Sequence, residues 1–269
     1  MRSRISSRAP VITGRTLAAR RRLSVRAALS LITCLLCLSI LPSRPSTAAM
    51  FDDVLAQSRA KYAALKSYAD TGTITTEATL PGNSDKDVEH HTFTTFYRAP
   101  RQFFFEFKKD TDVGDERFVI WADTAEFNTW WSSTQVHETY PQGHGAEAFA
   151  LAAFPTKNSS MQLSPMIFAQ AGLHGPIVDL KVLQADQIEQ VNGHRCHKLV
   201  GEVGLAYGTG TVTNVRPTII WIDADSLLVR KVLEDTPKGA GGTDRVTTTF
   251  EPQANPQIDD SHFKFAPPQ

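Results

Sequence analysis

Residues 92–109, TFTTFYRAPRQFFFEFKK, alternate apolar and polar side chains on both sides of Ala99-Pro100-Arg101. This pattern predicts two β-strands joined by a short loop, because proline cannot donate a ladder hydrogen bond. A loop with an odd number of residues pairs Tyr97 with Phe103, whereas an even loop spreads the aromatic side chains over both faces. The odd register is favoured, and it predicts an aromatic face made of Phe93, Tyr97, Phe103, Phe105 and Phe107.

This aromatic face must be covered by apolar groups, because side chains of this size are stable only when they are removed from water. Two coverings are open at this point. The protein's own core can close over the face, or the face can line a cavity that takes an apolar ligand.

The first 49 residues have the composition of a secretory signal peptide. They carry nine arginines and no acidic residue, and an uncharged apolar run of 15 residues, 27–41, is followed by the small residues Ser46, Thr47, Ala48 and Ala49. A basic region, a short apolar segment and small residues at the cleavage positions are typical of such signals. We therefore expect cleavage near Ala49 and export to the periplasm. A membrane anchor is the weaker alternative, since a spanning helix needs about 20 apolar residues.

Residues 50–269 are expected to form a single domain. About 220 residues suit one large β-rich unit. Its 19 basic and 28 acidic residues give a net charge of −9, which opposes nucleic acid and anionic membranes as partners. Cleavage would leave Cys196 as the only thiol, so no intrachain disulfide is expected. We expect Cys196 to be a half-buried strand residue and the protein to be a monomer.

The chain begins with a predicted amphipathic helix and then alternates between strands and short helices. The helix covers residues 51–67, because Phe51, Leu55, Ser58, Tyr62 and Leu65 share one stripe. Two alanine-rich segments, 146–154 and 165–173, are predicted as short helices that lie over the sheet. Besides the central hairpin, strands are predicted at 73–80, 117–123, 127–139, 178–184, 187–190, 194–203, 211–215, 217–222, 227–234, 245–252 and 262–265.

The order of these motifs resembles the LolA-like superfamily, which includes periplasmic carriers of outer-membrane lipoproteins and uncharacterised relatives. The resemblance spans most of residues 50–269 and rests on the first helix and on four later motifs. These are Tyr97-Arg98-Ala99-Pro100 with Phe103 to Glu106, Val191-Asn192-Gly193 with Cys196 and Leu199, Trp221-Ile222-Asp223 with Leu228 to Lys231, and Phe263-Lys264-Phe265-Ala266-Pro267.

The resemblance implies a mainly β fold with helices, an incomplete antiparallel barrel whose concave apolar face is covered by helices and accepts acyl chains. The five aromatic residues of the hairpin would then form the cavity wall. The lid would be formed by Phe149, Leu151, Phe154, Met166 and Ile167. In the lipoprotein carriers an arginine immediately before the motif's proline bonds the lid. Here Ala99 holds that place, and Arg98 is expected on the opposite face of the strand.

Catalytic and metal sites find little support in the sequence. We find no G-x-S-x-G elbow, phosphate loop or paired CxxC motif. His194-Arg195-Cys196-His197 is the best metal candidate, but on a strand His194 and Cys196 share a face from which His197 points away. We therefore expect no catalytic residue, metal or cofactor, and an enzyme is the third choice.

The sequence thus predicts an exported, non-enzymatic protein that binds lipid or lipidated protein, as a lipoprotein carrier would. The main alternative is a sensor or regulatory module of envelope state, because anti-sigma regulators contain a domain of the same fold. A carrier needs this domain and a partner that hands over cargo, whereas a regulator needs a second domain or an envelope membrane protein to bind. The resemblance leaves both open.

Overall fold

The computed structural model describes residues 47–79, 86–109, 115–123, 126–206, 212–237 and 242–268, all within one compact unit. The strands are β1 Ser67–Thr79, β2 Lys86–Arg98, β3 Gln102–Lys109, β4 Glu116–Ala122, β5 Phe127–Trp131, β6 Val136–Tyr140, β7 Lys181–Val191, β8 His194–Ala206, β9 Val212–Asp223, β10 Val229–Pro237, β11 Thr243–Phe250 and β12 Gln253–Ala254. The helices are α1 Thr47–Ala63, α2 Gly145–Ala153 and α3 Ser164–Ile167, with 3-10 turns η1 Ser159–Met161, η2 Ala169–Ala171 and η4 Asp260–Phe263.

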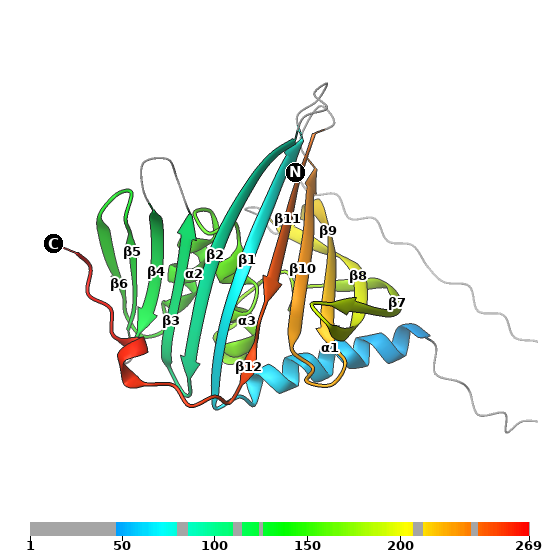
Figure 1. Cartoon of the computed structure of the whole chain (residues 1–269), viewed down its shortest axis with the longest axis horizontal. Coiled ribbons are helices and arrows are strands. Elements are labelled where there is room, and N and C mark those ends of the chain that lie inside the picture. Colours follow the sequence, from blue (N-terminus) through cyan, green and yellow to red (C-terminus); the bar gives the residue numbers. More distant parts are fainter. Residues whose placement is uncertain are drawn as a thin grey trace, which may run out of the picture. The chain divides into compact units, whose positions relative to one another are not determined.

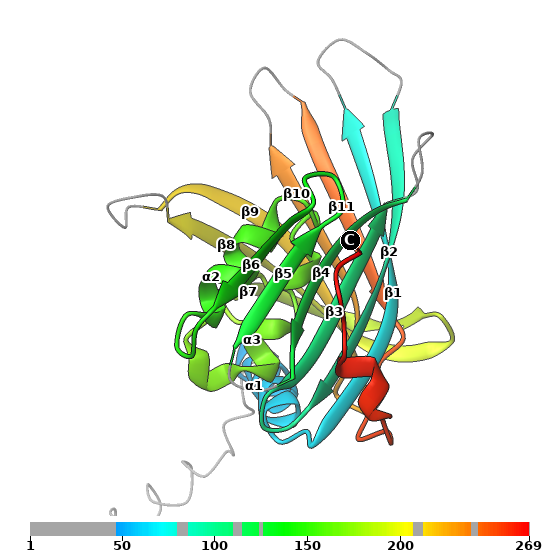
Figure 2. The same cartoon turned by 90° about the vertical axis from the view of Figure 1, so that its left-hand side faces the viewer.

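The strands form one antiparallel sheet in the order β6-β5-β4-β3-β2-β1-β11-β10-β9-β8-β7, and β12 pairs with β1 (Figure 1). Strands β6 and β7 stand at opposite ends of this order, so the barrel is incomplete. The sheet curves around α2 and α3, which lie against its concave side (Figure 2). The predicted fold class, an incomplete antiparallel barrel with an N-terminal helix and covering helices, is confirmed.

The β2–β3 hairpin has the predicted odd register. Tyr97 faces Phe103, Thr95 faces Phe105 and Phe93 faces Phe107 across a three-residue turn. All five aromatic residues point to the concave side and belong to the main core, where none is more than 6% exposed. The apolar side chains of β1, β9, β10 and β11 complete this core, among them Ile74, Ile220, Val232 and Phe250.

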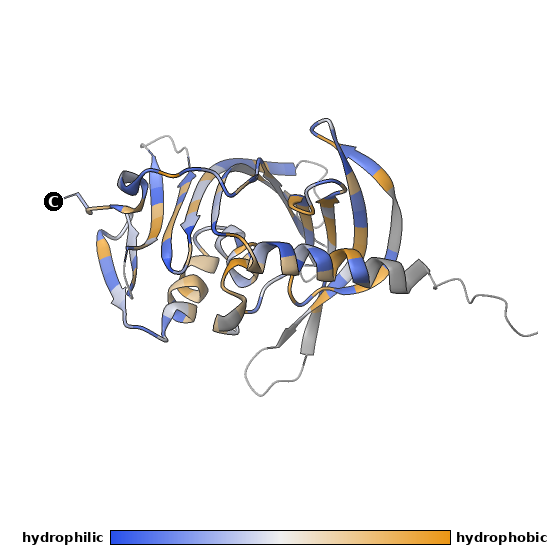
Figure 3. Ribbon diagram, turned by 90° about the horizontal axis from the view of Figure 1, so that it is seen from below, coloured by the Kyte–Doolittle hydropathy of each residue, from blue (hydrophilic) through white to orange (hydrophobic). Residues whose placement is uncertain are grey.

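Helix α1 lies along one end of the sheet and contacts β7, β9 and α3 (Figure 3). Of the predicted stripe, Leu55, Ser58, Tyr62 and Leu65 are buried, while the side chain of Phe51 is outside the described part. The helix ends at Ala63, four residues before the predicted Ser67, because the chain there turns into β1. The backbone N–H groups of Lys66 and Ser67 both donate to the side-chain oxygen of Asn255.

Several predicted element boundaries are wrong for identifiable reasons. Residues 127–139 form two strands, β5 and β6, because a turn at 132–135 places Gln135 at a φ of 56°. The predicted helix at 165–173 ends at Ile167 and continues as η2, since Phe168 has a non-helical ψ of 47°. The strand pairs predicted at 178–190 and 211–222 are single strands, β7 and β9, and β7 absorbs the irregular pattern in β-bulges.

The C-terminal segment runs along the outer face of the sheet, where residues 262–265 were wrongly predicted to form a strand. They belong instead to η4 and an extended tail, because their aromatic side chains fill two outer clusters. Phe263 packs with Ala69 and Phe96, and Phe265 packs with Trp121 and Trp130. Arg98 faces outward as predicted, with its guanidinium 5.0 Å from the ring centre of Phe263 and bonded to the carbonyl of Ile258.

Candidate functional site

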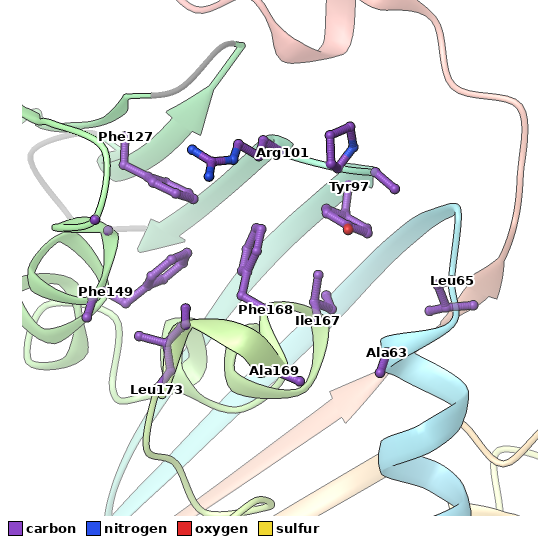
Figure 4. A pocket seen from close by; sticks show the side chains of 16 residues that line it. Ala63, Leu65, Tyr97, Arg101, Phe127, Phe149, Ile167, Phe168, Ala169 and Leu173 are labelled. Carbon is purple, nitrogen blue, oxygen red and sulfur yellow. The ribbon is translucent and has the colours of Figure 1, made fainter.

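A cavity of about 630 Å³ opens where the β2–β3 turn meets the covering helices. It lies between the end of α1, the turn, α2, and the segment from α3 to η2 (Figure 4). Its volume is within the range of natural small-molecule sites. The lining residues are mostly apolar: Ala63, Leu65, Tyr97, Ala99, Pro100, Arg101, Phe127, Gly143, Gly145, Ala146, Phe149, Ile167, Phe168, Ala169, Ala171 and Leu173.

The predicted cavity wall coincides with this cavity only at Tyr97. Phe105 stacks on Phe93 with ring centres 6.0 Å apart, and Phe93 in turn contacts Phe250. Phe107 packs beside His91 at the far end of the hairpin, 5.2 Å between ring centres. Phe93, Phe105 and Phe107 are therefore part of a closed core in this structure. The cavity lies nearer the β2–β3 turn than the sequence predicted.

Phe168 is the centre of the aromatic cluster that borders the cavity. Its ring centre lies 5.3 Å from Phe103, 5.4 Å from Tyr97, 5.5 Å from Phe127 and 5.8 Å from Phe149. Most of these pairs meet edge to face, the arrangement that aromatic quadrupoles prefer. Sequence reasoning missed Phe168 and Phe127. The run Phe149, Phe154 and Phe168 in alanine-rich helices was the available signal, but it did not show which rings point inward.

The predicted lid residues divide into two groups. Phe149, Met166 and Ile167 are buried under the sheet's concave side, and their role as a lid stays a prediction. Leu151 is 50% exposed and Phe154 is 88% exposed, so the prediction that they cover the aromatic face is wrong. At about 100° per helical residue, Leu151 lies roughly 200° and Phe154 roughly 140° around the axis from Phe149. Only one side of α2 can face the sheet, and Phe149 and Ala152 occupy it.

The turn end of the cavity carries one charged side chain among its described lining residues, Arg101. Gln142 lies beside it. With its amide turned so that the oxygen faces the guanidinium, Gln142 accepts from the two Nη atoms of Arg101 at 3.1 and 2.9 Å. Burial raises the pKa of Tyr97, so its hydroxyl stays protonated over the physiological range. The Arg101 guanidinium presents only hydrogen-bond donors, whereas the Tyr97 hydroxyl can both donate and accept.

Polar contacts attach the covering segment, residues 145–173, to the sheet at the end that lies away from the cavity. Glu89 on β2 accepts from Lys109 at 2.8 Å and pairs with Lys157 at 3.1 Å, and these contacts, led by the Lys109 hydrogen bond, hold its pKa at about 2. Buried Gln162 donates to Glu234 at 3.1 Å and to Thr248 at 3.0 Å. The covering segment is therefore bonded to β2, β10 and β11 at the end away from the cavity.

A buried carboxyl group lies on the concave side between these two regions. Asp70 on β1 accepts hydrogen bonds from the Tyr68 hydroxyl at 3.0 Å and from the backbone N–H of Glu251 at 2.9 Å. It is 2% exposed, and burial raises its pKa to about 8 despite both bonds. At neutral pH this group is mostly uncharged, which suits an apolar interior.

Metal and thiol chemistry have no evident centre in the described part of the chain. Within it, no group of three histidine, cysteine, aspartate or glutamate side chains is placed to hold a metal ion. Cys196 is fully buried on the outer side of β8, rather than half-buried as predicted, and burial raises its thiol pKa to about 11. None of the described helices is long and apolar enough to cross a membrane.

No protein-family model and no curated protein sequence matches this chain. Among solved structures, the lipoprotein LppX of Mycobacterium tuberculosis is similar to this chain, with 15% sequence identity and a TM-score of 0.41. The match covers 77% of this chain and 98% of the LppX chain. A LolA superfamily protein of Nitrosomonas europaea is similar at 7% identity and a TM-score of 0.32, covering 80% and 97%. The Pseudomonas aeruginosa MucA/MucB complex is similar at 11% identity and a TM-score of 0.39, covering 80% and 60%.

A LolA superfamily protein is thus among the solved structures to which this chain is similar. Each of these TM-scores is below 0.5. The proposals below therefore take their support from the contacts of this chain.

Proposed function

We propose that this chain is an exported protein that binds the acyl chain of a lipid or of a lipidated protein in the cavity beside Phe168. The observation that carries the proposal is the aromatic-walled cavity between the sheet and the covering helices. A lipoprotein carrier of the envelope is its finer form, with transfer between membranes as the physiological role.

The energetics of acyl transfer suit such a cavity. Each methylene moved from a membrane to water costs about 0.8 kcal/mol, so a chain of about 14 methylenes needs roughly 11 kcal/mol of replacement burial. The rings of Phe127, Phe149 and Phe168 converge on the cavity and offer apolar contact on several sides (Figure 4). A rigid aromatic wall supplies this contact with little loss of side-chain entropy.

The covering helices are built in a way that permits them to move. Helix α2 has nine residues and α3 has four, and segments this short depend on tertiary contacts for their stability. Near the cavity their contacts with the sheet are ring against ring. We therefore expect the cavity to enlarge by displacement of α2 and of the segment after α3.

Binding of a fluorescent fatty-acid probe tests the proposal, with two phenylalanine variants as a matched pair. Phe168→Ala removes the central ring of the cavity and should weaken binding by at least tenfold, since about 1.4 kcal/mol of lost burial is enough for that. Phe154→Ala removes an exposed ring at the C-terminal end of α2 and should bind like wild type. Equal binding by both variants, or no saturable binding by wild type, would contradict the proposal. Circular dichroism confirms that each variant is folded.

A sensor of envelope state is the second candidate, and the exposed pair Leu151 and Phe154 favours it. These residues lie on the helix whose inner side borders the cavity, so a ligand that moves α2 also moves an apolar surface. A carrier should transfer a bound acyl probe between two vesicle populations. A sensor should retain the probe, while amide exchange of α2 changes on binding.

A further inference from the structure

The single charged side chain among the described cavity-lining residues gives the cavity a defined polar end. Arg101 follows Pro100 in the β2–β3 turn and is exposed, whereas Phe149 and Ile167 on the covering helices, and Leu173 just after η2, are buried. The lining therefore changes from aliphatic and aromatic to cationic toward the turn (Figure 4). An amphiphile can satisfy both ends only if its apolar tail lies among the rings and its polar group lies at the turn.

The chemistry of Arg101 selects the charge of that polar group. A guanidinium has five N–H donors and no acceptor, and it matches the two oxygens of a carboxylate or phosphate. The described lining contains no aspartate or glutamate that would occupy it. Gln142 contacts the two Nη atoms through a neutral amide oxygen, which positions the guanidinium without neutralising it.

Three other cations of the hairpin and its surroundings are engaged elsewhere. Arg98, three residues earlier, points to the outer face and is engaged by Gln102, Asp260 and the Ile258 carbonyl. Lys109 and Lys157 lie at the other end of the hairpin and bind Glu89. A ligand acid that reaches the turn therefore meets the charge of Arg101.

We propose that the cavity takes a single-chain amphiphile with an acidic headgroup, and that Arg101 is the residue that selects the acid. This inference rests on the proposed acyl-binding function and names its ligand class. The tail provides most of the affinity, and the exposed ion pair provides a preference of roughly two- to fivefold over an uncharged headgroup. Because the pair is exposed, this preference falls as salt is added.

The test compares three ligands with the same chain length: laurate, dodecyl phosphate and 1-monolauroylglycerol, which is neutral. Each displaces the fluorescent probe from wild type, Arg101→Gln, Arg101→Lys and Arg195→Gln, at low and at high ionic strength. Arg195 is an exposed arginine on β8 and serves as the control. Wild type and Arg195→Gln should prefer an acidic ligand, Arg101→Gln should bind all three alike, and Arg101→Lys should recover part of the preference. The stronger of the two acids identifies the headgroup as carboxylate or phosphate.

The outcomes separate this inference from the proposed function. If wild type binds laurate, dodecyl phosphate and the neutral ester equally, or if Arg101→Gln keeps the preference, the role of Arg101 is wrong while acyl binding stands. If wild type binds neither the probe nor any of the three ligands, the proposed function itself is wrong.

Discussion

The buried carboxyl of Asp70 should make the stability of the protein fall as pH rises from 5 to 7. Burial raises the pKa of Asp70 to about 8, whereas the same group in the unfolded chain titrates near 3.9. Between these values the folded protein holds a proton that the unfolded chain has released. Raising the pH therefore favours the unfolded state. This sign is opposite to that of a salt-bridged carboxylate.

The size of the effect follows from one proton. Each pH unit between the two pKa values changes the free energy of unfolding by about 1.4 kcal/mol, so the loss from pH 5 to pH 7 is about 2.7 kcal/mol. Asp70→Asn keeps the shape of the side chain and an oxygen for the Glu251 N–H, and it cannot ionise. This variant should lose the contribution of Asp70 to the pH dependence and should be more stable than wild type at pH 8.

Urea unfolding at pH 5, 6, 7 and 8 measures these free energies, and the difference between wild type and Asp70→Asn isolates the group. The subtraction matters because burial lowers the pKa of His91, which makes stability rise with pH through the histidine range. Asp225→Asn, at an exposed turn position, is the matched control and should keep the wild-type slope. Parallel pH profiles for wild type and Asp70→Asn would refute the assignment of a neutral buried acid.

Two further substitutions and one mass measurement have defined outcomes. Phe105→Ala removes a ring that is 2% exposed and should lower the free energy of unfolding, measured in urea, by about 3–5 kcal/mol. The folded fraction of this variant should bind the acyl probe as wild type does. Loss of probe binding without loss of stability would instead place Phe105 in the site. Arg98→Ala releases the tail and should speed proteolysis after Ile258 at a cost of about 1–3 kcal/mol, and an unchanged cleavage rate would contradict the contacts seen here. The intact mass of the exported protein should match a start within a residue or two of Met50, whereas acylated Cys34 or Cys37 would make it a lipoprotein.

The hairpin could be predicted to the residue because its pattern admits one register. A slip by one residue would move Phe93, Tyr97 and Phe103 to the polar side, so the sequence carries a strong penalty against error. The beginning of β1 was harder to find. Residues 67–72 include Asp70 and Gly72, which strand propensity disfavours. Tertiary contacts explain both residues. The Asp70 carboxyl accepts hydrogen bonds from Tyr68 and Glu251, and a Cβ on Gly72 would lie 2.2 Å from the ring of Phe93.

The position of the cavity could not be predicted, because it depends on how α2 and the segment after α3 are oriented on the sheet. Every ring in these segments is apolar, and periodicity alone does not distinguish Phe149, which faces inward, from Phe154, which faces solvent. Phe168 occupies the centre of the cluster at a non-helical residue, where helical periodicity no longer applies. The cavity wall was therefore assigned to the whole aromatic face rather than to its turn end.

The two ends of the covering segment differ in a way that gives lid opening a direction. At the far end, Lys157 and Gln162 bind charged partners on the sheet, and separating them would leave Glu234 buried with one fewer donor. At the turn end, Phe149 and Phe168 contact the sheet through rings, and an acyl chain can replace those contacts in kind. The far end should therefore act as the hinge. A growing ligand would then separate the covering helices from Phe103 first and reach Phe105 and Phe93 only after the turn end has opened.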